Sequence, residues 1–246
     1  MLAFRRLLLF LILSTGAAGF GCGPEGTPDP AKLYQSRTPT DSLGTGRFFL
    51  GREIPRVRSH AEVAEWLNRP GRDQAEFPDR LVAALDLRPA DVVADIGAGT
   101  GFYSFRIAQL VPHGRVLATD IQPEMLDELR RRAVEEEIRN VEVVQGEEDD
   151  PNLPVNSIDL ALIVGSYHEF FYPYEMMTRV VESLVPGGRV VLVEYRGEDE
   201  TLPVAPIHRL TEEQARQEME FAGLRWVRTK RELPQQHVLI FEKPSL

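Results

Sequence analysis

The stretch VVADIGAGTGFYS, residues 92–104, decides the fold. It begins with an apolar run of strand length, continues with three alternating glycines and passes into a segment of helical composition. Glycine adopts positive φ angles at no steric cost, so a glycine-rich turn lets the backbone approach a ligand closely. In open parallel sheets, ligands bind at the carboxyl ends of the strands. The stretch therefore predicts a strand, a ligand-binding turn and a helix in succession.

The same alternation of strand and helix continues along the chain. Apolar runs of strand length at 115–120, 141–146, 158–166 and 189–195 are separated by segments of helical periodicity. Two further strand-like segments follow, on either side of Pro234. Repeated strand–helix units predict an α/β fold with a doubly wound, seven-stranded, mostly parallel sheet. Helices are expected on both faces, and the last strand is expected to be antiparallel.

Two acids accompany the glycine turn. Asp95 lies just before the glycines, and Asp120 ends the next strand, 19 residues after Gly101. An acid at the end of the second strand is placed to meet the ribose hydroxyls of a nucleotide-type cofactor. A glycine triplet alone is weak evidence, but here it follows an apolar strand, opens a helix and lies between two acids. The alternatives are that Asp95 caps the helix and that Asp120 is a turn residue.

Together these residues resemble the first motif of the class I S-adenosylmethionine-dependent methyltransferases. Dinucleotide dehydrogenases prefer G-x-G-x-x-G, whereas this chain has G-x-G-x-G after an aspartate. The spacing thus favours the sulfonium cofactor over NAD. The resemblance covers about residues 77–243 and implies a Rossmann-like fold with S-adenosyl-L-methionine as cofactor. It implies the following cofactor-binding residues: Asp95, Gly97, Gly99, Gly101, Asp120, Ile121 and Glu147.

Within that set, the resemblance gives each residue a part of the cofactor. The aspartate and the backbone of the turn meet the methionine end, Asp120 meets the ribose, and Ile121 packs against the adenine. Glu147 reads the adenine amino group, although the family more often has aspartate there. Glu147 also belongs to the acidic run 147–150, for which a solvated loop is the alternative.

The acceptor side is predicted from the segment SYHEFFY, residues 166–172, just after the fourth strand. Methyl transfer is an in-line displacement that depends mainly on how the acceptor is positioned. A general base is needed only if the acceptor must lose a proton. We predict that His168 acts as the base or orients the acceptor, with Glu169 tuning it. The alternative is that His168 is a loop histidine and that the neighbouring aromatic residues only pack.

Composition narrows the partners. The net charge of −10 disfavours a nucleic-acid partner. The basic run 130–132 is followed at once by the acidic run 135–137, a pattern typical of a solvated helix face. The single cysteine, Cys22, forms no intramolecular disulfide and no multi-cysteine zinc site. The five histidines show no H-x-x-x-H or H-E-x-x-H spacing, so no metal site is expected.

Residues 1–22 resemble a bacterial lipoprotein signal. Arg5 and Arg6 precede the apolar run 7–13, small residues follow, and Cys22 stands at the position of cleavage and acylation. Gly19 departs from the pattern, which usually has leucine there. The resemblance implies a lipidated, membrane-anchored protein of the cell envelope. An uncleaved anchor or a later start codon, with a cytoplasmic location or one at the cytoplasmic face of the membrane, is the alternative.

The expected organisation follows from these segments. Residues 23–46 are rich in Pro, Gly, Ser and Thr and predict a flexible tether. Residues 47–76 are expected to form a helical lid segment around Arg52, Glu53 and Trp66, and residues 77–246 the methyltransferase domain. The function expected is methyl transfer to a small-molecule acceptor.

Two other functions stay open at this point. S-adenosylmethionine is a cytoplasmic compound, and a cleaved signal would export the domain. A membrane-tethered, non-catalytic cofactor-binding or interaction module is therefore the second hypothesis. A nicotinamide-dependent oxidoreductase is the third, and the glycine spacing disfavours it.

Overall fold

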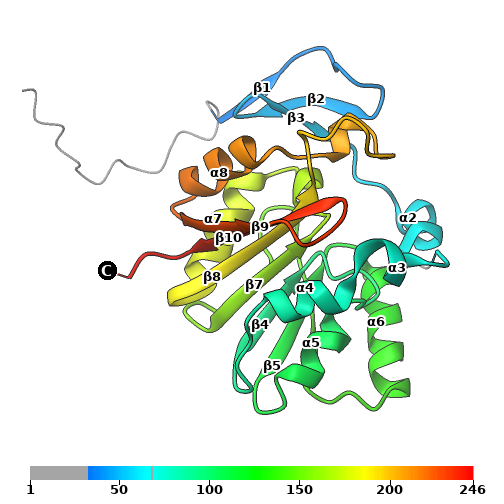
Figure 1. Ribbon diagram of the computed structural model, residues 1–246, viewed down its shortest axis with the longest axis vertical. Helices are drawn as coiled ribbons and strands as arrows, with labels where there is room; N and C mark the ends of the chain where they lie inside the picture. The colour runs from blue at the N-terminus through cyan, green and yellow to red at the C-terminus, as the bar shows by residue number, and fades with distance from the viewer. Residues whose placement is uncertain (1–32, 68, 246) are drawn as a thin grey trace, which may run out of the picture. The chain divides into compact units, whose positions relative to one another are not determined.

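A seven-stranded sheet forms the centre of the computed structural model, which describes residues 33–67 and 69–245. The strand order is β6-β5-β4-β7-β8-β10-β9 (Figure 1). Neighbours from β6 to β8 pair in parallel, whereas β10 runs antiparallel to both β8 and β9. The sheet confirms the predicted fold class. Its strands are β4 (Val92–Ile96), β5 (Arg115–Asp120), β6 (Val141–Gln145), β7 (Ile158–Val164), β8 (Leu184–Tyr195), β9 (Arg225–Lys230) and β10 (Gln236–Glu242).

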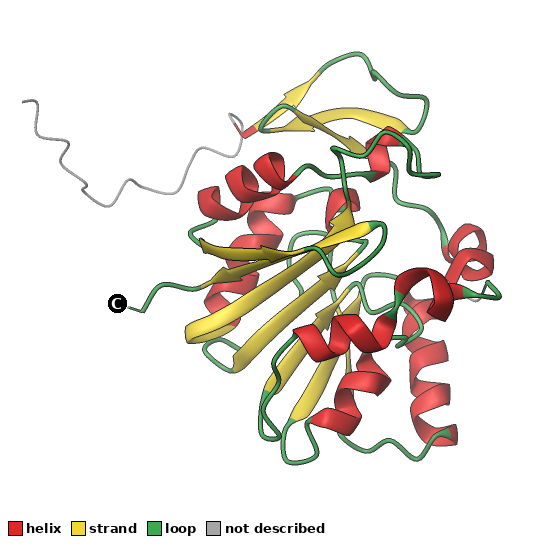
Figure 2. Ribbon diagram, in the orientation of Figure 1, coloured by secondary structure: helices red, strands yellow, loops and turns green. Residues whose placement is uncertain are grey.

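Helices cover both faces of this sheet (Figure 2). On one face, α7 and α8 bury Met177, Val180 and Met219 against the strands. On the other, α4 and α5 bury Leu81 and Ile107. Because both faces are covered, the parallel strands are continuous apolar runs rather than alternating ones. The helices that flank the sheet are α4 (Pro78–Ala84), α5 (Ser104–Leu110), α6 (Pro123–Glu135), α7 (Pro173–Ser183) and α8 (Glu212–Phe221).

The segment before this domain differs from the expectation. Residues 34–55, expected to end a tether and begin a helical lid, form an antiparallel sheet of β1 (Tyr34–Ser36), β2 (Gly44–Phe49) and β3 (Arg52–Pro55). The hairpin between β2 and β3 turns at Leu50 and Gly51, both with positive φ, as tight hairpins require. Phe49 and Ile54 are fully buried. The strands that carry these two residues pair with residues 34–46, so hydrophobic burial orders part of the segment that was predicted to be a flexible tether.

The helical part of the expected lid begins only at residue 60. The helices are α2 (His60–Leu67) and α3 (Arg72–Glu76). Glu62 caps the start of α2 as in one half of a capping box: the Ser59 backbone N–H and hydroxyl both donate to the Glu62 carboxylate at 2.7 Å. The lipoprotein-like signal with Cys22, and the tether up to residue 32, lie outside the described residues. Within the described ranges, no helix is long and apolar enough to cross a membrane.

A buried ion pair connects the small sheet to the domain. The Arg52 guanidinium, on β3, donates to both carboxylate oxygens of Glu218, on α8, at 2.7 and 2.8 Å. Glu218 also accepts from the Tyr167 hydroxyl at 2.6 Å. Arg52 donates further to the backbone oxygen of His168 at 2.9 Å. Arg52, expected in a helical lid segment, lies instead on a strand and connects β3 to the loop after β7.

Candidate active site

The glycine turn after β4 has the conformation that its glycines predict. Gly97, Gly99 and Gly101 have φ of 72°, 54° and 83°. A Cβ on Gly97 would lie 2.6 Å from Ser166 Oγ, and one on Gly101 would lie 2.7 Å from the Phe105 ring. The first contact joins the turn to the end of β7, and the second seats α5 on the turn. Glycine is therefore required here both by backbone conformation and by close packing.

Asp120 fixes the turn from the end of β5. One carboxylate oxygen accepts from the Gly99 backbone N–H at 2.9 Å, and the other accepts from that of Gln122 at 2.9 Å. Burial raises the pKa of the Asp120 carboxyl, while these two backbone donors oppose that rise. Each oxygen retains a further lone pair for a ligand hydroxyl. The predicted ribose acid thus lies beside the glycines.

Asp95 is almost completely buried at the end of β4, 3% exposed. Burial raises the pKa of its carboxyl to about 6, although the Ser104 hydroxyl donates to it at 2.6 Å and lowers it again. Asp120 contributes a further rise through charge repulsion. Burial makes the ionised form of this carboxylate unfavourable. A cationic ligand beside it would stabilise the ionised form, so the site favours such a ligand.

A single cavity unites these groups. It encloses about 1230 Å³, a figure that includes the space open to solvent. Its lining runs from the glycine turn after β4 and the end of β5 to residues beyond the end of β7. The predicted cofactor residues among its lining are Asp95, Gly97, Gly99, Asp120, Ile121 and Glu147. Gly101, also predicted, packs beneath the turn against Phe105 instead and donates its N–H to the Ala98 oxygen at 3.0 Å.

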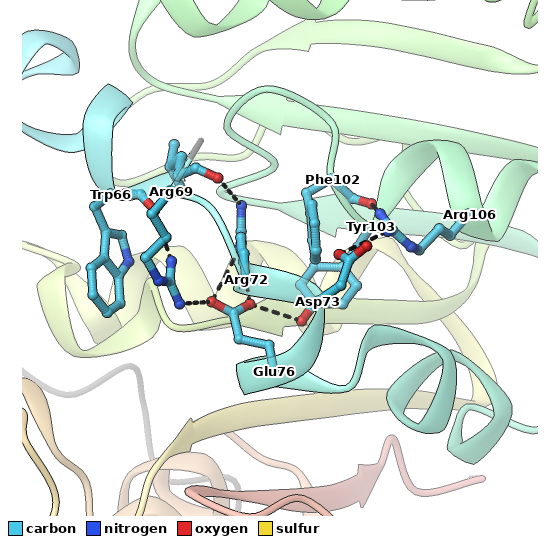
Figure 3. Close-up of polar contacts among 9 residues, drawn as sticks. Trp66, Arg69, Arg72, Asp73, Glu76, Phe102, Tyr103 and Arg106 are labelled. Atoms are coloured by element: carbon cyan, nitrogen blue, oxygen red, sulfur yellow. Dashed lines mark hydrogen bonds and ion pairs between the residues drawn. The ribbon is translucent and has the colours of Figure 1, made fainter.

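The helices α2 and α3 contribute residues to one wall of the cavity. Figure 3 shows the polar contacts around these residues. Trp66 and Leu67 from α2 line the cavity, together with Arg72 from α3 and Phe102 and Tyr103 from the turn. Stacking holds the group together: the Arg69 guanidinium lies 3.6 Å from the Trp66 ring centroid, and that of Arg72 lies 3.8 Å from the Phe102 ring centroid.

Glu76, at the end of α3, is the centre of this lid. Its carboxylate accepts from Arg69 at 2.6 Å, from Arg72 at 3.1 and 3.2 Å, and from the Tyr103 hydroxyl at 3.2 Å (Figure 3). Glu76 is buried and Tyr103 belongs to the motif segment. One carboxylate therefore connects α3 and the loop before it to the segment of the glycine turn. The sequence predicted Trp66 as a lid residue, but the roles of Arg72 and Glu76 were missed.

The predicted acceptor-side residues lie in a short 3₁₀ helix, η1 (Tyr167–Glu169), after β7. Glu169 lines the cavity, whereas His168 lies behind the wall and is 5% exposed. His168 Nδ1 lies 2.8 Å from a carboxylate oxygen of Glu194, a fully buried residue of β8, and its Nε2 lies 3.1 Å from His208 Nδ1. The strongest partner of His168 is thus Glu194. Glu169, predicted to tune it, lies 3.8 Å from its Nε2.

The pKa shifts of His168, His208 and Glu169 follow from their burial and from the charges of their neighbours. Burial lowers the pKa of His168, but the Glu194 carboxylate more than offsets it, so the pKa is raised overall. Burial, followed by the charge on His168, lowers the pKa of His208 to about 4. Burial raises the pKa of Glu169. The structure places the predicted pair together, and the proposed catalytic roles of His168 and Glu169 stay predictions.

Comparison with known proteins gives a consistent result. A family model described as "Methyltransferase domain" matches residues 93–188. The chain is 30% identical over 181 residues to the ubiquinone/menaquinone biosynthesis C-methyltransferase of Ectopseudomonas mendocina, a match that covers 68% of each protein. It is 32% identical over 130 residues to aklanonic acid methyltransferase of Streptomyces sp. strain C5, covering 52% of this chain but only 58% of that enzyme.

Among solved structures, the chain is similar to an S-adenosylmethionine-dependent methyltransferase from Aquifex aeolicus. The TM-score is 0.71 at 22% identity, and the match covers 76% of this chain and all of that one. At this identity the structural match supports the fold alone. The sequence matches place the chain in the S-adenosylmethionine-dependent methyltransferase family, whose cofactor is S-adenosyl-L-methionine.

The residues of the cavity fit that cofactor. The buried Asp95 carboxylate suits the methionine ammonium, and the positive-φ glycines leave the backbone bare where the methionine end would lie. Asp120 suits the ribose hydroxyls, and Ile121 and Met125 supply an apolar wall for the adenine ring. Glu147 is exposed at the rim, in reach of the cavity.

Proposed function

We propose that this protein transfers the methyl group of S-adenosylmethionine to a small-molecule acceptor bound in the same cavity. The observation that carries the proposal is the continuity of the cavity. It extends from the cofactor acids Asp95 and Asp120 to Glu169, Phe170 and Phe171 beyond the end of β7. A ligand on the glycine turn and a second ligand beside η1 would therefore be neighbours.

The chain's residues would act mainly by binding and orientation. When bound, the cofactor supplies an electrophilic methyl group on a positively charged sulfur. Asp95 would hold its methionine end and Asp120 its ribose, and Trp66 and Leu67, which line the cavity, would exclude water from it. Such positioning converts a bimolecular encounter into a reaction within one complex, which can lower the activation barrier by about 7–11 kcal/mol.

The acceptor side of the cavity is mainly apolar, with one ion pair. Phe170, Phe171 and Met176 offer flat or flexible apolar contacts, and Glu169 lies in the wall with Arg58, whose Nε is 3.6 Å from the Glu169 carboxylate. The named relatives methylate aklanonic acid and compounds of ubiquinone and menaquinone biosynthesis, according to their names. These relatives and the aromatic lining support an acceptor with an apolar ring and an oxygen substituent.

Calorimetric titration tests the cofactor half of the proposal. We expect the purified full-length chain to bind S-adenosylmethionine and its demethylated product, and not NAD. Binding of NAD alone would favour the oxidoreductase alternative. Binding of neither would contradict both enzymatic functions and leave the non-catalytic module. Methyl transfer itself is measured by mass spectrometry of phenolic and quinol acceptors incubated with a methyl-deuterated cofactor.

We also propose that Cys22 is acylated and tethers the domain to the membrane. The signal-like pattern of residues 1–22 supports this proposal. Mass spectrometry of the native N-terminus measures it directly: a lipid-modified Cys22 at the first position is expected. An intact Met1 or an unmodified N-terminus would contradict the proposal.

A further inference from the structure

We propose that His168, Glu169 and His208 form a binding site for a divalent first-row transition metal at the acceptor end of the cavity. His168 Nε2 and His208 Nδ1 lie 3.1 Å apart, and Glu169 Oε1 lies 3.8 Å from each of them. With these three separations, the point that is equally far from all three atoms lies about 2.1 Å from each. That distance is the usual length of Zn–N and Zn–O bonds. The cluster therefore already has the spacing of a metal site.

The hydrogen bonding leaves one atom of the cluster without a donor. Glu169 Oε1 is buried, and among the described residues it has no hydrogen-bond partner. The nearest cation is Arg58, whose Nε lies 3.6 Å away. This Nε likewise has no hydrogen-bond partner among the described residues. A buried carboxylate oxygen without a donor is costly. A direct bond between the two imidazoles would not relieve it, whereas a cation between the three atoms would.

Glu194 orients His168 as metal-binding histidines are oriented. Its carboxylate accepts from both the backbone N–H and the Nδ1 of His168, at 3.2 and 2.8 Å. A hydrogen at Nδ1 leaves the lone pair on Nε2, which faces the cluster. This carboxylate–histidine pairing is the usual support of a histidine ligand and raises its basicity. Glu194 is fully buried, so its charge also requires nearby positive charge.

The three ligand atoms indicate which metal ions would bind and how many coordination positions would stay open. Two imidazoles and one carboxylate suit Zn²⁺, Fe²⁺, Co²⁺ or Mn²⁺ better than Mg²⁺ or Ca²⁺, which prefer oxygen ligands alone. Three protein ligands leave at least one position open, as in catalytic rather than structural sites. Two carboxylates and two neutral imidazoles would be balanced in charge by one dication. The side chain of Arg58 is 41% exposed, and its guanidinium would have to move away from Glu169 when a metal binds.

The site would deepen the proposed function. Glu169 belongs both to the cluster and to the cavity wall, so the open position would be available to an oxygen of the acceptor. His168 would then orient the acceptor through the metal. This role rests on the proposed methyl transfer, whereas metal binding itself does not.

Direct metal binding tests the inference. The full-length chain, purified without a histidine tag and treated with a chelator, is titrated with Zn²⁺ alone in calorimetry and analysed by elemental mass spectrometry. We expect one Zn²⁺ per chain. His208→Ala should lower the affinity at least about 100-fold, and Glu194→Gln, which removes no ligand, about 10–100-fold. His113→Ala, at an exposed histidine elsewhere, should bind as the wild type does.

Two further measurements guard against misfolded variants. Co²⁺ added to the wild type should give the visible absorption bands of a four- or five-coordinate site with nitrogen ligands. S-adenosylmethionine binding and circular dichroism are recorded for every variant. Absence of saturable Zn²⁺ binding to the wild type, or equal binding by a folded His208→Ala variant, would overturn the site. Zn²⁺ binding without cofactor binding would leave it standing and contradict the proposed function instead.

Discussion

The backbone N–H of Gly99 donates to the side chain of Asp120 at 2.9 Å, so the glycine turn and the end of the next strand form one unit. The two features come from different strand–helix units and meet because β4 and β5 are parallel neighbours. The carboxyl ends of such strands lie at the same edge of a sheet. The acid that would bind the ribose therefore also sets the shape of the turn that would bind the methionine end.

Replacing Asp120 with asparagine should weaken cofactor binding without unfolding the chain. Asparagine retains an oxygen for one of the two backbone donors but loses the charge. Hydrogen bonds to charged groups contribute about 1.5–3 kcal/mol, so we expect the affinity for S-adenosylmethionine to fall about 10- to 100-fold. Calorimetric titration measures it. Asp127→Asn, at an exposed acid on α6, is the control and should change affinity less than twofold. Equal losses of cofactor affinity in both variants would contradict the assignment of Asp120 as the residue that binds the ribose.

Gly97→Ala should destabilise the fold more than an ordinary glycine substitution at positive φ. The new Cβ would meet Ser166 Oγ at 2.6 Å, and the left-handed conformation alone costs about 1–2 kcal/mol. Overpacking adds about 1–3 kcal/mol. Gly223→Ala is the matched control, because Gly223 has a φ of 92° and nothing within 4 Å of its Cβ position.

Denaturant unfolding gives the free energy of unfolding of both variants. The double variant Gly97→Ala with Ser166→Gly should recover the part of the loss that comes from the contact. If Gly97→Ala and Gly223→Ala cost the same, the close approach of the turn to the end of β7 has no energetic importance.

Most of the sheet could be predicted from the sequence because its strands are buried on both faces. The runs at 92–96 and 115–120 coincide with β4 and β5, since a continuous apolar run bounded by glycine or acid has few other uses in an α/β chain. The small sheet before the domain was missed. Its residues 34–46 are polar or small, and only the later partners of β2 bury Phe48 and Phe49. Such long-range burial leaves little local signal.

The site divides in the same way. The predicted cofactor residues follow one another in the order of the motif, and all of them except Gly101 line the cavity. Glu194 carried a weak signal, a lone carboxylate in an apolar strand, and was not recognised. His208 carried none, because it lies 40 residues from His168 and meets it only through the packing of two short helices, η1 and η2 (Pro206–His208).

Glu76→Gln should loosen the lid. The substitution removes the charge that holds Arg69 and Arg72, while the shape of the side chain is preserved. We expect hydrogen exchange across residues 60–76 to become faster and cofactor affinity to fall about tenfold, because Trp66 and Leu67 line the cavity. Tenfold corresponds to about 1.4 kcal/mol, within the range for a hydrogen bond to a charged group.

Asp73→Asn is the control for the lid. Asp73 is on the same helix and pairs with Arg106 (Figure 3), but its side chain is 58% exposed, so its ion pair contributes less than about 1 kcal/mol. Exchange and affinity should both stay close to the wild type. Unchanged exchange in Glu76→Gln would show that stacking of the arginines on Trp66 and Phe102 holds the lid without Glu76.

Asp95 should make stability and function respond to pH in opposite directions. Its pKa is about 6 in the fold, against 3.8 for the ordinary carboxyl. Below about pH 4 the carboxyl is protonated in both folded and unfolded chains and costs nothing. As the pH rises from about 4 to 6 the unfolded chain ionises first, so the free energy of unfolding falls, by about 3 kcal/mol for a shift of this size. Above about pH 6 the cost is constant.

Asp95→Asn separates the two effects. At pH 8 the variant should be more stable than the wild type in denaturant unfolding, and the stability difference should vanish near pH 4. Its affinity for S-adenosylmethionine should nevertheless be lower at pH 8, since the ionised carboxylate is the partner expected for the methionine ammonium. In the wild type this affinity should rise with pH through about 6, and in the variant that rise should be absent. A variant that is less stable at pH 8, or that binds the cofactor as tightly as the wild type, would contradict the assignment of Asp95 as a buried charge kept for its ligand.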